Sequence, residues 1–462
     1  MKLTIACTLA LALALAGCSL GPAYHRPATP AVKAWRTPIP AAARAWPAGD
    51  WWRAFGSPEL DRLIREAEQA NDDLAAAIAR VREADAQVMV QSAPLLPSAD
   101  ASFTADRQKI YDLFSPRGGG ILIRYFSTAV DASYEVDFWG ENRAIRAAAL
   151  ATEAANRYDR ATVELTVLSS VADTYFTVLE LRERVRIAQA NLASAELTLK
   201  GLTLDESVGT TTSLDVAQQA SAVASLSAAI PPLRTALQQS LDALAILVGR
   251  PPERLKIAAS RLSSIVPPEP SVGLPSKLLE RRPDVAEAEA ELVAANADIR
   301  AARAAFFPNI DLTASAGYES AKMQSLIGPG SRIFAISGGV TQPIFHGQAL
   351  LGQYRYSKAR YAELLADYRK AVLSAFGNVE DSLASVRGTT DQQQREADAV
   401  GKSRRAYDLS QAQFHAGTVN ILTVLSTETA LFTSEDAYAQ VKLAHLEALV
   451  GLYNALGGGW RR

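Results

Sequence analysis

The sequence predicts an α+β membrane protein in which four strands per chain form part of a lipid-facing sheet that continues into long α-helices. Three features of the 462-residue chain predict this fold class. Four short segments alternate apolar and polar residues, two very long segments contain no proline, and the same order of segments occurs twice. The chain is therefore expected to consist of two internal repeats.

The four alternating segments are expected to be β-strands with one apolar and one polar face. A period of two residues places successive side chains on opposite faces of a sheet. Their lengths approach the roughly 9–11 residues with which a tilted strand crosses a bilayer. Because the Ala-rich helical segments offer no large matching apolar surface, lipid is the expected cover of the apolar face; a soluble two-layer sandwich is the alternative. The strands are expected at about 98–108, 124–138, 309–320 and 332–344.

Each strand pair precedes a long segment without proline, which indicates helices of coiled-coil type. Helix corners are expected at about 205–213 and 414–421, where a Gly-Thr pair interrupts each segment. Glycine permits the backbone angles that a helix end needs, and threonine favours leaving the helix. Landmarks of the two halves recur at nearly one offset: Pro97 and Pro308 lie 211 residues apart, Gly140 and Gly347 207, and Gly209 and Gly417 208.

The N-terminus reads as an export signal. A short basic start and an apolar stretch precede Leu15-Ala16-Gly17-Cys18, which resembles the cleavage site of bacterial lipoproteins. Cys18 would become the lipidated first residue of the mature chain, and Ser19 after it favours the outer membrane by resemblance to lipoprotein sorting. An ordinary secretory signal that happens to contain cysteine is the alternative. Residues 18–56 are rich in proline and are expected to form an extended, lipid-anchored tether.

Composition excludes several function classes. A formal net charge of −2 gives no reason to expect nucleic acid binding. The sequence contains no Gly-x-Ser-x-Gly elbow, no phosphate-binding Gly-Lys-Ser/Thr loop and no metal-ligand spacing of cysteine and histidine. The protein is therefore expected not to be an enzyme, and to carry neither a metal nor a cofactor apart from the covalent lipid on Cys18.

Four strands cannot close a barrel, and open sheet edges in hydrocarbon leave costly unpaired N–H and C=O groups. Several copies must therefore pool their strands. Two copies would give eight strands and an interior filled by side chains, whereas three would give twelve and an open lumen. Polar residues on the strands suit water and favour the open form, with these carboxylates expected in the lumen: Asp100, Asp131, Glu135, Asp311 and Glu319.

Three stretches resemble the outer membrane factor, or TolC-like, family, specifically its efflux-system lipoproteins. They are YEVDFWGENR at 134–143, LLERRPDVAEAEAELVAANADIRAARAAFFPNIDL at 278–312 and TQPIFHGQAL at 341–350. The resemblance implies a homotrimer with a twelve-stranded β-barrel in the outer membrane and a long α-helical barrel across the periplasm. It also implies two partners, a periplasmic adaptor protein and an inner-membrane pump of the RND type.

In that family the two helix corners form the periplasmic tip, which closes the channel at rest and contacts the adaptor. The resemblance assigns this role to matching residues of both corners: Gly209, Thr210, Asp215, Phe414, Gly417 and Thr418. Val419, Thr423 and Ser426 stand where several relatives carry charged residues. This departure favours a tip that opens by partner contact. Asp215 has an equally weighted second interpretation as a helix N-cap.

The predicted division of the chain follows these landmarks. It comprises a signal peptide 1–17, a tether 18–56, repeat 1 at 57–249, a Pro-rich linker 250–276, repeat 2 at 277–456 and a tail 457–462. The implied function is a passive outer-membrane exit duct for small molecules in a tripartite efflux system. The alternative is a lipid-anchored coiled-coil scaffold or adaptor that conducts nothing.

Overall fold

The computed structural model describes residues 21–30, 32, 34–36, 46–111, 120–258, 261–269, 272, 273 and 275–461. The predicted signal peptide and Cys18 lie outside these residues. The chain divides into two compact units. The first, called the sheet unit, comprises Met1–Ala28, Arg80–Arg157 and Glu287–Arg369. The second, called the helical unit, comprises Thr29–Ala79, Tyr158–Ala286 and Lys370–Arg462.

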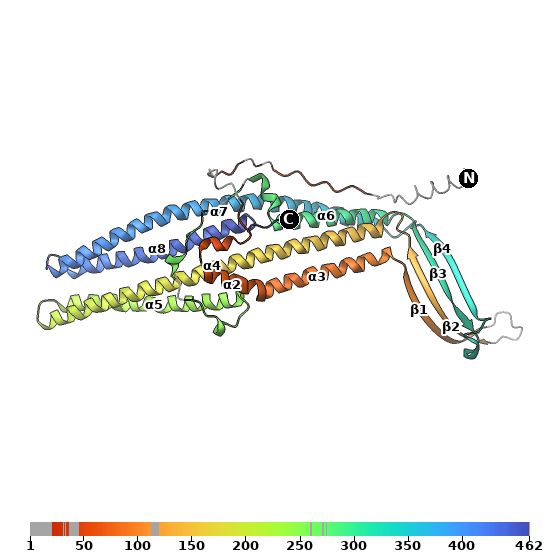
Figure 1. The fold of residues 1–462 in the computed structure, drawn as a ribbon, viewed down its shortest axis with the longest axis horizontal. Coiled ribbons are helices and arrows are strands. Elements are labelled where there is room, and N and C mark those ends of the chain that lie inside the picture. The colour runs from red at the N-terminus through yellow and green to blue at the C-terminus, as the bar shows by residue number, and fades with distance from the viewer. Residues whose placement is uncertain are drawn as a thin grey trace. The chain divides into compact units, whose positions relative to one another are not determined.

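Two halves of the chain repeat one order of elements, a helix, two strands, a long helix and a shorter helix, and the first half has one further helix before them (Figure 1). The long helices α4 and α7 both have 67 residues, and the return helices α5 and α8 both have 35. This equality confirms the predicted internal repeat. The first half contains α2 (Pro58–Ala70), α3 (Asp72–Ser92), β1 (Ser98–Tyr111), β2 (Gly120–Glu135), α4 (Glu141–Ser207) and α5 (Ser213–Leu247). The second contains α6 (Pro283–Ala304), β3 (Asn309–Ser320), β4 (Arg332–Thr341), α7 (Ala349–His415) and α8 (Ile421–Ala455).

The four strands form one antiparallel sheet in the order β1-β2-β3-β4. β1 is longer than expected and reaches Tyr111, whereas β2 and β4 end three residues early. At β4 the cause is Pro343, which has no N–H to donate to a ladder. After β2 the chain turns, and the Phe138 amide donates to the Val136 carbonyl at 2.7 Å.

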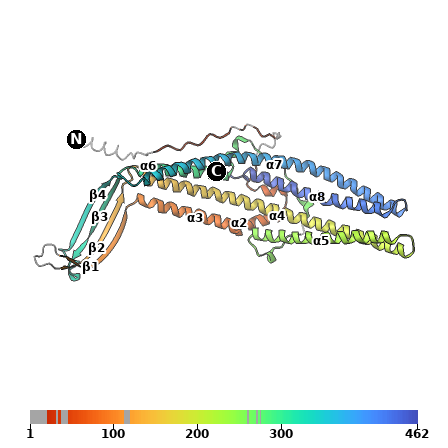
Figure 2. The ribbon, with the colours of Figure 1, turned by 180° about the vertical axis from the view of Figure 1, so that it is seen from behind.

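The helix starts follow from local capping. The Ser57 hydroxyl accepts from the Leu60 amide at 3.2 Å, with Pro58 at the first helical position of α2. Asn71 begins α3 in the same way, because its side-chain oxygen accepts from the Leu74 amide at 3.0 Å. In the helical unit, α4 lies beside α5 and α7 beside α8, in both views of the chain (Figures 1 and 2).

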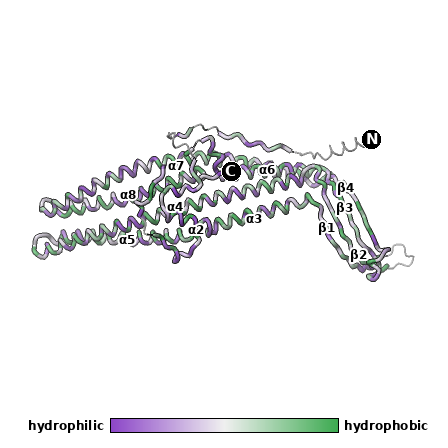
Figure 3. Tube along the Cα trace, viewed as in Figure 1, coloured by the Kyte–Doolittle hydropathy of each residue, from purple (hydrophilic) through white to green (hydrophobic). Residues whose placement is uncertain are grey.

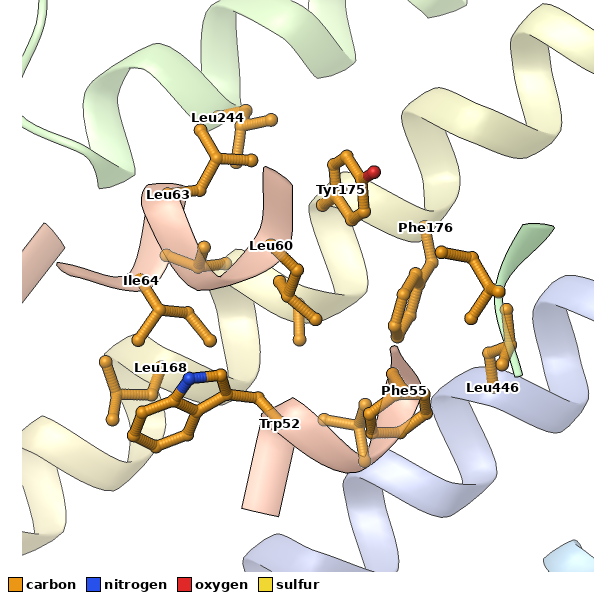
Figure 4. Close-up of a cluster of buried hydrophobic side chains, with 14 of the residues drawn as sticks. Trp52, Phe55, Leu60, Leu63, Ile64, Leu168, Tyr175, Phe176, Leu244 and Leu446 are labelled. Carbon is orange, nitrogen blue, oxygen red and sulfur yellow. The ribbon is translucent and has the colours of Figure 1, made fainter. Parts of the chain in front are cut away.

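The core of the helical unit gathers around α2, α4, α5 and α8 (Figure 4). Phe55 is fully buried, with its ring centroid 5.1 Å from that of Phe176 and 6.3 Å from that of Tyr453. Trp51 stacks on Tyr453 at 5.3 Å. Burial of such aromatic side chains contributes a large share of a core's stability.

The end of the predicted tether is not extended. Trp51–Phe55 forms a 3-10 helix with Trp51, Trp52 and Phe55 buried. The prediction of an extended tether is therefore wrong for these residues. Burial of the three aromatic side chains outweighs the extended preference of the prolines before them. The predicted linker also contributes to this core, through Leu262 and Ile265.

Candidate functional site

Register places the five predicted lumen carboxylates on one face of the sheet. Asp100 pairs with Asp131, Glu135 with Asp311, and Ser127 with Glu319. Hydroxyls share the face, since Ser102 donates to the Asp131 carboxylate at 3.4 Å and the Thr313 and Ser337 hydroxyls lie 2.7 Å apart. A face with these groups is suited to water. Its role as a channel lumen stays a prediction.

The opposite face is apolar over most of its length and largely exposed. Phe334 and Ile336 are 83% and 82% exposed, values that a soluble fold rarely shows for adjacent large side chains on one face. Lipid is the cover that fits such a band. The apolar and aromatic members are Ala99, Ala101, Phe103, Ala105, Tyr111, Leu122, Phe126, Val130, Ala132, Tyr134, Ile310, Leu312, Ala314, Ala316, Tyr318, Phe334, Ile336 and Val340.

Among the described residues, β1 and β4 each have a strand partner on one side only. Backbone groups at a sheet edge must be paired before the edge can enter hydrocarbon. Closure therefore requires the edges of further copies. Within the same residues, no helix combines the length and apolar character needed to cross a bilayer, and along the helices hydrophilic and hydrophobic residues are interspersed (Figure 3).

The two predicted helix corners have the same backbone geometry. Gly209 and Gly417 adopt φ values of 76° and 71°, the left-handed conformation that glycine allows without strain. The Gly209 amide donates to the Glu206 carbonyl and the Thr210 amide to the Asp205 carbonyl, both at 2.9 Å. These two bonds form a Schellman motif, which satisfies carbonyls left open at a helix end.

The second corner repeats these bonds at the same offset. The Gly417 amide donates to the Phe414 carbonyl and the Thr418 amide to the Gln413 carbonyl, both at 2.9 Å. Each threonine hydroxyl adds a bond to the carbonyl that its amide already contacts, at 2.9 Å for Thr210 and 3.0 Å for Thr418. Glycine supplies the turn and threonine closes it, which explains why the Gly-Thr pair occurs twice.

The helices that follow the two turns begin differently. Thr212 is the N-cap of α5 and forms a capping box with Asp215, so Asp215 is the third helical residue and not the N-cap. Its carboxylate accepts from the Thr212 hydroxyl at 2.6 Å and from the Thr211 hydroxyl at 3.1 Å, and the bond from Thr212 is the main cause that lowers the pKa of Asp215. At the equivalent place α8 has Asn420 as its cap and Thr423 in place of the carboxylate.

A small apolar cluster joins the two helix hairpins near their turns. Leu202 of α4 packs with Ile421 and Val424 of α8, each 2–3% exposed. Phe414 packs against this cluster and also lines a cavity of about 310 Å³ between the hairpins. Phe414 therefore holds the hairpins together; its predicted contact with an adaptor stays a prediction.

A polar network that the sequence analysis missed links the same hairpins. The Tyr407 hydroxyl lies 3.0 Å from the Ser194 hydroxyl, accepts from the Gln411 amide nitrogen at 2.6 Å, and donates to Glu428 at 3.5 Å. Desolvation by burial raises the pKa of Glu428 and is also the main cause that raises the pKa of Tyr407. No sequence signal marks these residues, because they belong to three helices and meet only in the fold.

A second missed set lies along a groove of about 650 Å³ between α4, α5 and α8. Arg184 binds the Asp436 carboxylate at 2.7 Å and that of Glu180 at 3.4 Å. Beside the groove, burial and, to a smaller extent, Glu447 raise the pKa of Asp173 to about 7. One Asp173 carboxylate oxygen is buried without a hydrogen-bond partner among the described residues.

Replacing Asp173 by asparagine is expected to raise the thermal unfolding midpoint at about pH 8 and to change it less near pH 5. Between the ordinary value of 3.8 and the folded value of about 7 the folded state binds a proton that the unfolded state does not. Stability from this raised pKa is therefore present at low pH and lost as the pH rises through about 7. Far-UV circular dichroism of the solubilised protein measures the midpoint. Asp391→Asn, an exposed change, is the control; equal shifts at both pH values would contradict the expectation.

Comparison with known proteins identifies the family. The sequence model described as outer membrane efflux protein matches residues 63–250 and 274–458. The pyoverdine export outer membrane protein OpmQ of Pseudomonas aeruginosa is 42% identical over 454 residues, which cover 97% of this chain and 95% of OpmQ. The toluene efflux pump outer membrane protein TtgC of Pseudomonas putida is 32% identical over 460 residues, covering 97% and 94%. The open-state MtrE outer membrane channel of Neisseria gonorrhoeae superposes with a TM-score of 0.86 at 28% identity, covering 96% and 99%.

These similarities extend over nearly the whole of each chain, so they concern the complete fold and not one motif. The predicted fold class, the outer-membrane location and the role as an efflux channel component are thereby confirmed. The chain belongs to the outer membrane efflux protein family.

Proposed function

We propose that three copies close their sheets into a twelve-stranded barrel, continued by a barrel of long helices in the periplasm. One observation carries this proposal: each sheet has an acidic face, an apolar face and two edges that no other strand of the described residues covers. Twelve strands leave room for a water-filled lumen, whereas eight fill their interior with side chains. Edge pairing between copies removes the unpaired backbone groups from hydrocarbon.

In this proposal the barrel is the passive exit duct of a tripartite, RND-type efflux system. A periplasmic adaptor protein contacts the two hairpin turns, an inner-membrane pump supplies the energy, and the chain itself carries out no chemical step. The pump selects the cargo, and the duct is unselective among small molecules. Two relatives that are both 32% identical to this chain support this point, because the name of one refers to toluene and the name of the other to antibiotics.

The duct and the non-conducting scaffold predict different results. Unheated membranes run on SDS-PAGE are expected to show a heat-modifiable trimer, and the purified protein is expected to conduct ions in planar bilayers with a preference for cations. Replacing the five lumen carboxylates Asp100, Asp131, Glu135, Asp311 and Glu319 by their amides is expected to shift the reversal potential in a salt gradient toward zero. Glu253→Gln with Glu269→Gln, both in the linker, is the control. A trimer-free, silent preparation would favour the scaffold.

The same recording tests the resting state of the tip. The turns are held by backbone bonds and an apolar cluster, and the positions Val419, Thr423 and Ser426 offer no charged lock. We therefore expect low conductance from the protein alone and a rise when its adaptor is added. A wide-open channel without the adaptor would contradict a closed resting state.

We further propose that the signal peptide is cleaved before Cys18, which thereby becomes the N-terminal residue and is acylated. Its support is the sequence at residues 15–18, which resembles a lipoprotein cleavage site. Growth with labelled palmitate is expected to label the wild-type protein and leave the Cys18→Ser variant unlabelled. Cys7→Ser, within the predicted signal peptide, is the control and should not change the labelling.

A further inference from the structure

The charges of the four strands are sorted between the two faces of the sheet. The register puts Asp106, which pairs with Tyr125, on the same face as the five predicted lumen carboxylates. Every carboxylate of the described strands therefore lies on the polar face. Every cation lies on the opposite face: Arg107, Lys109, Arg124 and Arg332. Alternation of polarity alone does not require this separation, since a lumen accepts either sign of charge.

Three of the four cations, Arg107, Lys109 and Arg124, gather at one end of the apolar face. The fourth, Arg332, begins β4 in the pairing row of Tyr318 and Thr128, four residues nearer the helix end than Arg124. Arg107 pairs directly with Arg124, and Arg332 pairs with Tyr318. All three arginines and Lys109 are exposed. They lie near the turns that join β1 to β2 and β3 to β4, whereas the other end of the sheet leads into α4 and α7. The cluster, here called the basic rim, therefore occupies the end of the sheet away from its connections to the helices.

The height of the apolar band places Arg124 of the basic rim at a membrane surface. Tyr134, at the helix end of the apolar face, stands ten residues from Arg124 along β2. At about 3.4 Å per residue and a tilt of about 40°, this separation spans about 26 Å of membrane normal. The apolar band of outer-membrane barrels is about 25 Å tall. Arg124 therefore falls at the level of lipid headgroups.

Pairing with a neighbouring strand cannot neutralise the rim. Arg107 and Lys109 stand on one edge strand and Arg332 on the other, so edge pairing between identical copies joins two strands that carry cations and no carboxylate on this face. The apolar face of the described strands carries no carboxylate in any copy. The charge that complements the rim must come from outside the sheet.

We propose that the basic rim binds the phosphate groups of the glycolipid in the outer leaflet, lipopolysaccharide, and thereby anchors the barrel in an asymmetric membrane. The inference rests on the proposed barrel, which turns this face toward lipid. Arginine matches the geometry of phosphate oxygens and lysine binds them as a point charge. Long cationic side chains lay their stems along apolar surface and keep the charge at headgroup level.

The test measures retention of lipid A by the full-length, detergent-purified protein in native mass spectrometry. Diphosphoryl lipid A and its fully dephosphorylated form are the probes. Wild-type protein is expected to retain the diphosphoryl form at least about tenfold more strongly. A variant with Arg107, Lys109, Arg124 and Arg332 changed to glutamine is expected to lose that preference. A variant with the three arginines changed to lysine is expected to keep most of it.

A matched control changes four exposed cations of α4 and α7, Lys200, Arg387, Arg395 and Arg405, to glutamine and is expected to bind lipid A as the wild type does. If the glutamine variant of the rim does not assemble, the two wild-type measurements still decide the matter. Equal retention of both probes by a heat-modifiable wild-type trimer overturns the inference and leaves the barrel intact. A wild-type preparation with no heat-modifiable trimer removes the proposed function itself.

Discussion

Arginine in place of Val130 is expected to abolish the heat-modifiable trimer. Val130 lies in the middle of β2 on the apolar face, between Ala101 and Ala316, and is 55% exposed. An arginine at the lipid midplane costs a barrel about 2–4 kcal/mol per copy, and a closed trimer would carry three. Unheated SDS-PAGE of membrane fractions measures the loss, and proteolysis of whole cells shows whether unassembled chain is degraded.

The neighbouring residue gives the control for this experiment. Ala129 stands at the same depth on the polar face, opposite Ser102 and Gly317. Arginine there meets water and carboxylates such as Asp131, so the Ala129→Arg variant is expected to assemble. If the two variants assembled equally well, the assignment of the apolar face to lipid would be wrong.

Alanine in place of Phe55 is expected to destabilise the helical unit by about 3–5 kcal/mol, the usual loss for a fully buried aromatic side chain. Phe55 is 0% exposed and contacts the rings of Trp51, Phe176 and Tyr453. The substitution leaves a cavity where helices α4 and α8 meet the short 3-10 helix. Guanidinium unfolding of the solubilised protein, followed by circular dichroism, measures the shift.

Val266→Ala is the matched control, because Val266 follows the same core in the linker but is 61% exposed. Its loss is expected to stay within about 0.5 kcal/mol. A comparable shift in both variants would mean that the unfolding transition does not report this core. A small shift for Phe55→Ala alone would place the aromatic cluster outside the cooperative unit.

Periodicity predicted the elements of this fold well because both patterns are strong and long. Alternation along Asp100–Asp106 and Asp311–Glu319 fixes which side chains share a face, and register between antiparallel neighbours then follows from the turns. The Gly-Thr corners could be located because a left-handed residue after a helix nearly always requires glycine or asparagine. These are local rules, and the sequence contains all that they need.

The parts that escaped prediction depend on contacts between distant segments. Trp51–Phe55 looked like the end of a proline-rich tether, since nothing in that segment shows that α4 and α8 offer it a pocket. Tyr407 and Glu428 meet across α7 and α8, and Asp173 owes its pKa to burial beside a groove of three helices. Contacts between side chains of separate helices can be identified only once the packing of those helices is known.

The helices that follow the two turns are capped differently, and this difference affects the rotational symmetry of a trimer. The backbones of the two turns are nearly interchangeable, so three copies around one axis would present six turns of almost identical shape. Only the helix that follows the first turn has a carboxylate at its start, Asp215, whereas the helix that follows the second turn has the neutral residues Asn420 and Thr423 there. By shape the assembly would be close to sixfold, and by electrostatic potential it would be threefold. A docking protein that sensed only shape could settle in two orientations, and one that sensed charge would have a single choice.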